Sequence, residues 1–249
     1  MSGKNTLLII LCGLFAQHAW ATEIDIYLVR HGKTMFNTTG QVQGWSDSPL
    51  TEQGILQAKQ AGNGLKGVHF ITAFSSDSGR ARETAKIILQ ENDTADKPEL
   101  IELKSLREWG YGGYEGRDDA ELWKPLFAAK KVEFLKDWST WEAFTDKMTD
   151  REMADAIAEN DKTGTAENYS AIVTRLKKGM ASIIDKTEAK GGGNALVVSH
   201  GSAIPTLLTL YAPEQYHGES IGNASLTILH YSEGKFTLKK LADSHYLAE

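Results

Sequence analysis

The sequence predicts an α/β fold of three layers, in which helices cover both faces of a mostly parallel sheet. Short apolar runs rich in β-branched residues alternate with longer amphipathic stretches, which is typical of strands joined by crossover helices. Two of the runs end in the same way, in a histidine followed by a glycine, at residues 29–32 (VRHG) and 198–201 (VSHG). Of the 249 residues 41% are hydrophobic and 24% charged, which excludes a disordered or fibrous chain.

The first elements of the alternation lie between residues 24 and 103. Residues 24–29 (IDIYLV) predict a buried strand that ends at Arg30 and His31. Thr51 is a typical N-cap for a helix over residues 51–65. The stretches that follow predict, in order, a strand over 70–75, a helix over 78–89 and a short strand over 100–103.

The second half of the chain begins with a change of character. Residues 118–163 contain Trp123, Trp138 and Trp141 among many charged residues at helical spacing, and we expect a helical insertion that caps the domain. The alternation then resumes with a helix over 167–186, a strand over 195–199, a helix over 202–211 and an edge hairpin over 225–231 and 235–241. We therefore expect one domain over residues 22–249, with 118–163 inserted.

The first 21 residues read as a signal peptide. They contain one lysine, an apolar run over 7–16 and the small-residue site Ala19-Trp20-Ala21, which predicts cleavage before Thr22. The run is about half the length that a membrane-spanning helix needs, so no stable membrane anchor is expected. We expect an exported protein, periplasmic or secreted. Cys12, the only cysteine, would leave with the peptide, which excludes a disulfide, a thiolate nucleophile and a cysteine-ligated zinc.

The charge balance limits the partners. A formal net charge of −6 argues against a general electrostatic grip on nucleic acid or on an anionic membrane, so any bound anion must be held by a local cluster. We expect that the protein needs neither a metal nor another cofactor. The sequence leaves the oligomeric state open.

The two strand-ending histidines are the central functional feature. In open α/β sheets the ligand lies beyond the carboxyl ends of the strands, so His31 and His200 are expected to meet there. Arg30 supplies a planar guanidinium group suited to phosphate oxygens, and Arg80, at the start of the predicted helix 78–89, is a second. Helix N-termini nearby favour an anion as well. These groups predict a pocket for a dianionic phosphate group.

Two imidazoles in such a pocket indicate phosphoryl chemistry. Arg30 favours the neutral form of His31, which could attack phosphorus and form a phosphohistidine. His200 could donate hydrogen bonds to the oxygens on which charge develops. The leaving alkoxide then needs an acid. Glu108, among the aromatic residues of LREWGY, is the first candidate and Glu115 the second, and local sequence does not choose between them.

At these residues the sequence resembles the histidine phosphatase superfamily, the phosphoglycerate-mutase-like proteins. The likeness covers most of residues 22–249, and five segments carry it in order: LVRHGKTMFN (28–37), GWSDSPLTEQG (44–54), SSDSGRARETA (75–85), LREWGYGGYEG (106–116) and VVSHGSAI (197–204). It implies that His31 is the phosphorylated nucleophile and that Glu108 is the proton donor. The residues that it implies for phosphate binding are Arg30, Asn37, Arg80, His200 and Gly201.

The resemblance also favours one branch of the family and one reaction. Gly201 stands where the acid phosphatase and phytase branch would place an aspartate, and residues 33–35 lack that branch's arginine, so the chain resembles branch 1. The mutases of branch 1 carry paired arginines after the glutamate segment. Here Arg117 and Arg151 are the only arginines between Glu108 and Arg175, and they are far apart.

These features favour hydrolysis of small phosphorylated metabolites, with water as the acceptor. Two alternatives remain open: phosphoryl transfer of the mutase type, and a non-catalytic exported binder of phosphorylated ligands. The substrate's alcohol part would be selected by residues 118–163.

Overall fold

The computed structural model describes residues 22–247, which form an α/β fold with a mixed six-stranded sheet. The predicted signal peptide, with Cys12, lies outside the described residues. The strand order is β3-β2-β4-β1-β5-β6. The strands are β1 (Glu23–Arg30), β2 (Phe70–Ser75), β3 (Leu100–Glu102), β4 (Gly193–Ser199), β5 (Leu226–Ser232) and β6 (Lys235–Asp243).

The sheet divides into a parallel part and an antiparallel edge. Strands β3, β2, β4 and β1 run parallel, while β5 pairs antiparallel with β1 and with β6. The β5–β6 connection is the expected edge hairpin, and its two turn residues, Glu233 and Gly234, both have positive φ as a tight hairpin turn requires. The prediction of a mostly parallel sheet is therefore confirmed, with two antiparallel strands at one edge.

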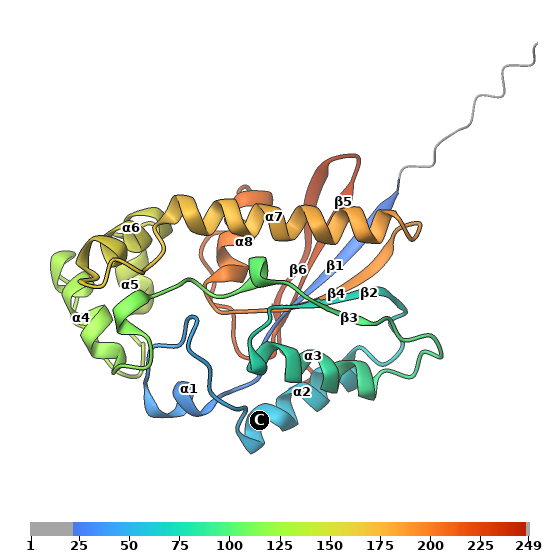
Figure 1. The fold of residues 1–249 in the computed structure, drawn as a ribbon, viewed down its shortest axis with the longest axis horizontal. Coiled ribbons are helices and arrows are strands. Elements are labelled where there is room, and N and C mark those ends of the chain that lie inside the picture. Colours follow the sequence, from blue (N-terminus) through green and yellow to red (C-terminus); the bar gives the residue numbers. More distant parts are fainter. Residues whose placement is uncertain (1–21, 248–249) are drawn as a thin grey trace, which may run out of the picture.

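Helices cover both faces of the sheet (Figure 1). On one face lie α2 (Glu52–Gly64) and α3 (Gly79–Glu91), and on the other α7 (Tyr169–Glu188) and α8 (Ala203–Tyr211). Residues 118–163 form α4 (Asp119–Ala129), α5 (Trp141–Thr145) and α6 (Asp150–Asn160) at one end of the molecule. Two 3₁₀ turns, Lys104–Leu106 and Gly112–Tyr114, connect β3 to this segment. Of the helices between residues 22 and 247, none combines the length and apolar character that crossing a bilayer requires.

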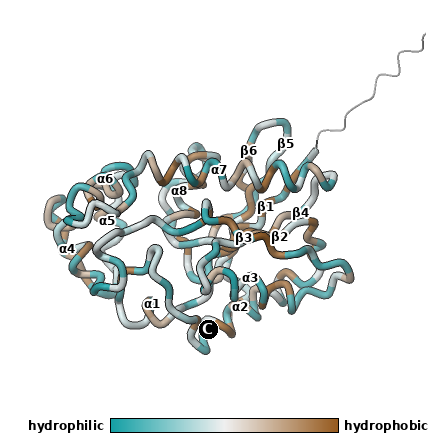
Figure 2. The backbone as a smooth tube through the Cα atoms, viewed as in Figure 1, coloured by the Kyte–Doolittle hydropathy of each residue, from teal (hydrophilic) through white to brown (hydrophobic). Residues whose placement is uncertain are grey.

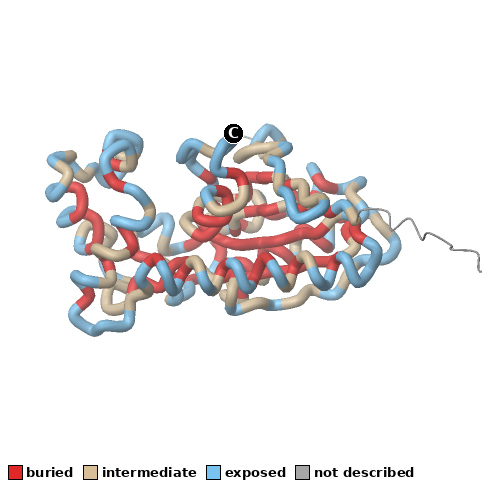
Figure 3. The backbone as a smooth tube through the Cα atoms, turned by 90° about the horizontal axis from the view of Figure 1, so that it is seen from above, coloured by how far each residue is buried: buried red, intermediate tan, exposed pale blue. Residues whose placement is uncertain are grey.

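The alternation along the strands explains the two-sided core. In β1, Ile24, Ile26 and Leu28 are buried in one cluster, whereas Val29 belongs to the cluster on the opposite face. The first cluster continues from α7 into α4, α5 and α6, so the 118–163 segment packs onto the same core as the sheet. Figure 2 shows the strands as the hydrophobic centre, and Figure 3 shows the buried backbone running through the middle of the molecule.

The element ends follow local capping. Thr51 accepts a hydrogen bond from the backbone amide of Gly54 and so caps α2 as predicted. Helix α7 begins at Tyr169 and not at Glu167, because Asn168 caps it by accepting from the amide of Ala171. A short helix that the sequence did not predict, α1 (Met35–Thr39), follows the first histidine. A capping box between Thr34 and Asn37 stabilises its N-terminus.

Candidate active site

The strand register places the two histidines side by side. Strands β1 and β4 pair in parallel, and their last residues, Arg30 and Ser199, lie opposite each other. The residue that follows each strand is a histidine. The amide of His31 donates to the carbonyl oxygen of Ser199 at 3.0 Å. The two imidazole rings lie with centroids 5.2 Å apart at an interplanar angle of 62°. Two residues that are 169 positions apart in the chain therefore share one place at the carboxyl rim of the sheet.

His31 is held in one orientation. Its Nδ1 lies 2.8 Å from the carbonyl oxygen of Gly32, an acceptor only, so Nδ1 carries the proton and donates it. In the neutral ring Nε2 then has the free lone pair. Burial, with the charges of Arg80 and Arg30, holds the pKa of His31 well below its usual value, against a smaller opposing effect of the bond to Gly32. The ring is therefore neutral near pH 7, with Nε2 as its nucleophilic atom.

His200 is completely buried. Its Nε2 lies 3.4 Å from Oγ of Ser78, and its Nδ1 has no hydrogen-bond partner among the described residues. Burial, then the charges of Arg80, His31 and Arg30, hold the pKa of His200 well below its usual value. An unpaired buried polar atom of this kind costs free energy.

The two predicted arginines are anchored by backbone oxygens. Arg30 donates through Nη1 to the carbonyl of Ile221 at 2.7 Å. Arg80 is 1% exposed and donates to the carbonyls of Ser46 and Gly44, and its Nη1 lies 2.9 Å from Oδ1 of Asp47.

The Nε atoms of both guanidinium groups are buried and have no partner in the described part of the chain. Together with Nδ1 of His200, three unused nitrogen atoms are therefore buried around the two histidines.

Gly201 and Asn37, the remaining predicted phosphate-binding residues, lie in different surroundings. An added Cβ at Gly201 would lie 2.9 Å from Cζ of Arg30, so the glycine gives the guanidinium group its space. Asn37 lies exposed on α1, where its Oδ1 accepts from the amide of Thr34 and from Nδ2 of Asn223 at 3.4 Å. Because Oδ1 is used as an acceptor, the Nδ2 group of Asn37 is the one that can donate to an anion.

The two candidate acids are in different surroundings. Glu108 is 6% exposed and accepts from the amides of Ser202 and Ala203, both at 2.9 Å, at the start of α8 directly after His200. Burial raises the pKa of Glu108 above its usual value, and the amides of Ser202 and Trp109 and the charges of Arg80 and Arg30 oppose part of the rise. The carboxyl group is thus held at the start of α8, where Ser202 lies two residues after His200, and it has an increased tendency to hold a proton.

Glu115, the second candidate, is used otherwise. Its two oxygens accept from four backbone amides, those of Gly44, Trp45, Ser46 and Tyr111, at 2.8–3.0 Å. These bonds fix the loop whose carbonyls hold Arg80. The structure therefore gives Glu115 the task of organising a loop, whereas Glu108 accepts from the amides of the residues that follow His200 and Gly201.

Sequence reasoning missed several residues that support the site. Asp47 pairs with Arg80, Asn223 donates to the carbonyl of His31 at 3.0 Å, and Ser78 lies beside His200. Arg175 forms a two-point ion pair with Glu167 and donates to the backbone oxygen of Glu108 at 3.0 Å. Asp47 and Ser78 fall within the motif segments 44–54 and 75–85, whereas Glu167, Arg175 and Asn223 lie outside all five segments and carry no local signal.

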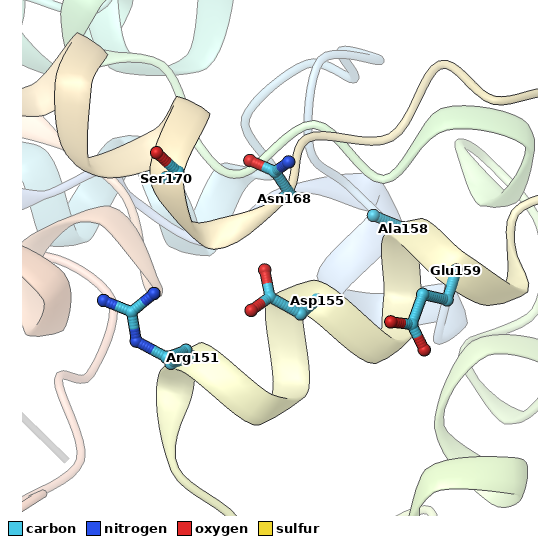
Figure 4. A pocket seen from close by; sticks show the side chains of 6 residues that line it. All are labelled: Arg151, Asp155, Ala158, Glu159, Asn168 and Ser170. Carbon is cyan, nitrogen blue, oxygen red and sulfur yellow. The ribbon is translucent and has the colours of Figure 1, made fainter.

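Two hollows lie outside the histidine pair. One, of about 460 Å³, lies between α6 and the start of α7 and is lined by Arg151, Asp155, Ala158 and Glu159 of α6 together with Asn168 and Ser170 (Figure 4). None of the predicted site residues lines it. The other, of about 340 Å³, has Asn37 in its wall and lies between α1 and the 118–138 stretch. Within residues 22–247, the structure groups no three or more His, Cys, Asp or Glu side chains as a metal site.

The comparisons with known proteins agree with this arrangement. The model of the histidine phosphatase superfamily (branch 1) matches residues 26–145 and 131–244. The chain is 30% identical to a 2,3-bisphosphoglycerate-dependent phosphoglycerate mutase 2 of Gloeobacter violaceus over 74% of this chain and 73% of that protein. It is 28% identical to a metal-independent phosphoserine phosphatase of Arabidopsis thaliana over 90% of this chain and 83% of that one.

A solved structure shows the same fold. The crystal structure of a phosphoglycerate mutase from Bacillus anthracis str. Sterne matches with a TM-score of 0.81 and 36% identity, covering 91% of this chain and 96% of that chain. The paired histidines on neighbouring parallel strands, the family model over most of the chain and this fold lead to one conclusion. The chain belongs to branch 1 of the histidine phosphatase superfamily.

Proposed function

We propose that the protein is a phosphatase that hydrolyses small phosphomonoesters through a phosphohistidine on His31. The observation that carries the proposal is the state of this ring. Its Nδ1 is tied to the Gly32 carbonyl, its pKa is lowered by burial and two arginines, and Nε2 is left as a neutral nucleophile beside His200. A nucleophile in this state serves covalent catalysis.

The reaction would proceed in two displacements. In the first, Nε2 of His31 attacks phosphorus, the P–O bond to the alcohol breaks, and the leaving oxygen takes the proton of the Glu108 carboxyl group. In the second, water attacks phosphorus, the P–N bond breaks, and the Glu108 carboxylate takes a proton from that water. Free phosphate leaves, and both residues return to their starting states.

The unused donors would stabilise the charge that develops in both steps. Within residues 22–247, Arg30 and Arg80 each have a buried Nε without a partner, and His200 has a buried Nδ1 without one. Donors fixed in advance toward the transferring phosphoryl group contribute more than donors that must reorient during the reaction.

The two arginines between Glu108 and Arg175 favour water as the acceptor over a second hydroxyl group. Arg117 is exposed and paired with Glu121, and Arg151 stacks on the ring of Tyr169 with its Cζ 4.6 Å from the centroid. Neither is placed beside the histidine pair by any contact in the structure. The mutase reaction stays the second candidate, since relatives with 30% identity carry that name.

The test is to trap the intermediate. Wild-type protein incubated with ³²P-labelled phosphomonoester and quenched in alkali should retain acid-labile label, and His31→Ala should retain none and release no phosphate from p-nitrophenyl phosphate. The matched control is His69→Ala, which removes an exposed histidine at the opposite end of β2.

Each alternative gives a different outcome. Label on His31 with isomerised phosphoglycerate and no free phosphate would show a mutase. Tight binding of phosphorylated ligands without label or turnover would show a binder. Full activity in folded His31→Ala would exclude the phosphohistidine mechanism.

We also propose that the chain is exported after cleavage before Thr22. The charged, apolar and small-residue parts of residues 1–21 support this proposal. Mass spectrometry of the protein recovered from its native host would find Thr22 as the first residue. An intact N-terminus in a cytosolic fraction would refute it.

A further inference from the structure

The backbone around Glu108 is held by an ion pair and not by regular secondary structure. Residues 107–111 lie between the 3₁₀ turns Lys104–Leu106 and Gly112–Tyr114 and belong to no helix or strand. Glu108 and its neighbour Trp109 are nevertheless buried. Buried backbone groups need hydrogen-bond partners, so the position of Glu108 depends on the side chains that supply them.

One arginine supplies three of these partners. Arg175 of α7 donates through Nη1 to the carbonyl oxygens of Ser105 at 3.2 Å and Arg107 at 2.7 Å. Its Nη2 donates to the carbonyl oxygen of Glu108 at 3.0 Å. That oxygen also accepts from Nε1 of Trp45 at 3.1 Å. Arg175 therefore fixes the backbone at Glu108 and at two of the three residues before it.

Glu167 holds the backbone on the other side of Glu108. Its carboxylate forms a two-point ion pair with Arg175, with Nε 2.9 Å from Oε1 and Nη2 2.6 Å from Oε2. The same Oε2 accepts from the amide of Gly110 at 3.0 Å, and the amide of Glu167 donates to the carbonyl of Gly110 at 2.8 Å. The side chains of Arg175 and Glu167 are 15% and 11% exposed, so water competes little with these bonds.

The carboxyl group of Glu108 is held by a different element. Its oxygens accept from the amides of Ser202 and Ala203, at the start of α8. The backbone of Glu108 is thus fixed from α7, and its carboxyl group is fixed from α8. Proton transfer needs a donor–acceptor distance of about 2.6–3.2 Å, so a small displacement of this backbone would move the acid out of reach of the leaving oxygen.

We propose that the Glu167–Arg175 pair positions Glu108 to protonate the leaving alcohol. This inference rests on the proposed phosphatase reaction. A guanidinium group has five N–H donors, and Arg175 makes five hydrogen bonds within the protein. No donor of Arg175 remains for a substrate, so the pair acts through Glu108. Disturbing the pair therefore slows the bond cleavage that needs a proton and spares the cleavage that does not.

The experiment measures kcat/KM for p-nitrophenyl, phenyl and ethyl phosphate, whose leaving oxygens need a proton increasingly in that order. This constant reports cleavage of the P–O bond, because the later attack of water is the same for all three esters. Arg175→Lys keeps the charge, but a single ammonium group cannot make the same five bonds. It should reduce kcat/KM for ethyl phosphate on the order of 10-fold to 100-fold and leave p-nitrophenyl phosphate close to wild type.

Two further variants accompany Arg175→Lys. Glu167→Gln removes the charge of the carboxylate and keeps an acceptor for the amide of Gly110. It should show the same selective loss for ethyl phosphate, and it serves as the test if Arg175→Lys does not fold by thermal melting. The matched control is Arg82→Lys, which alters an exposed arginine paired with Glu102 at 3.4 Å, and it should keep the wild-type values for all three esters.

The outcomes separate the inference from the proposed function. A selective loss for ethyl phosphate in the folded variants, with the control unchanged, supports the positioning role. Equal losses on all three esters, or wild-type values in both variants of the pair, would overturn it. Absence of p-nitrophenyl phosphate hydrolysis by the wild-type protein would instead overturn the proposed function.

Discussion

A single methyl group added at Gly201 tests whether the position of the Arg30 guanidinium group is needed to hold the phosphate group. In Gly201→Ala the new Cβ would lie 2.9 Å from Cζ, 3.1 Å from Nε and 3.2 Å from Nη2 of Arg30. Carbon atoms pack at about 3.5 Å or more, so the guanidinium group must move by about 0.6 Å. It cannot do so freely, because Nη1 is bonded to the carbonyl of Ile221 at 2.7 Å.

The expected effects follow from this displacement. Overpacking of this kind costs about 1–3 kcal/mol of folding free energy, and each kcal/mol lowers Tm by about 2–4 °C in a domain of this size. A misplaced charged donor should reduce kcat/KM more strongly, on the order of 10-fold to 100-fold. Gly201 is not among the residues with positive φ, so its backbone accepts alanine and the effect is purely steric.

The assay is phosphate release from p-nitrophenyl phosphate together with a thermal melt. Gly67→Ala is the matched control, because an added Cβ there meets no atom within 4 Å and the residue lies outside the site. We expect that control to behave as wild type in both measurements. A folded Gly201→Ala protein with wild-type kcat/KM would refute the role of Arg30 in holding the phosphate group.

Four further predictions concern the acid, the loop, pH and metals. Glu108→Gln should lower kcat most for alkyl phosphates and least for p-nitrophenyl phosphate, since a good leaving group needs no proton; equal losses would remove Glu108 from the acid role. Glu115→Gln should lower kcat/KM for all substrates alike and reduce the free energy of unfolding by about 1–3 kcal/mol, because four backbone amides donate to the two oxygens of Glu115. The lowered pKa of His31 keeps its Nε2 unprotonated well below pH 6.5, so the alkaline side of the pH profile is set by Glu108, whose pKa is raised. The value of kcat/KM for alkyl phosphates should therefore fall as the pH rises through the raised pKa of Glu108. In Glu108→Gln this fall at higher pH should be absent. EDTA should leave phosphate release unchanged, since Arg30 and Arg80 supply the positive charge; strong inhibition would contradict this.

The sequence was sufficient for the elements whose burial pattern is local. Strands β1, β2 and β4 were predicted within two residues, because each is an apolar run closed by polar residues. The meeting of His31 and His200 was predictable for the same reason, since both residues follow parallel strands. Helix α1 was missed because its five residues are too few to show a helical period.

The supporting groups depend on contacts that no local pattern records. Glu108 accepts from the amides of Ser202 and Ala203, which lie 94 and 95 positions later in the chain. The carbonyls that hold Arg80 come from a loop more than 30 positions earlier. That loop is itself fixed by Glu115, which the sequence presented only as an alternative acid. Such partners are set by the path of the chain in space, and only the folded structure reveals them.

The order of the strands determines when the site can form during synthesis or refolding. Strand β1 lies between β4 and β5, so its hydrogen-bonding neighbours on both sides come from the last quarter of the chain. A growing polypeptide that has reached residue 190 already contains His31, both arginines and Glu108, yet it lacks the strand against which the first histidine is aligned. Catalytic competence therefore arises late and abruptly during synthesis or refolding, and recovered turnover would report completion of the whole sheet.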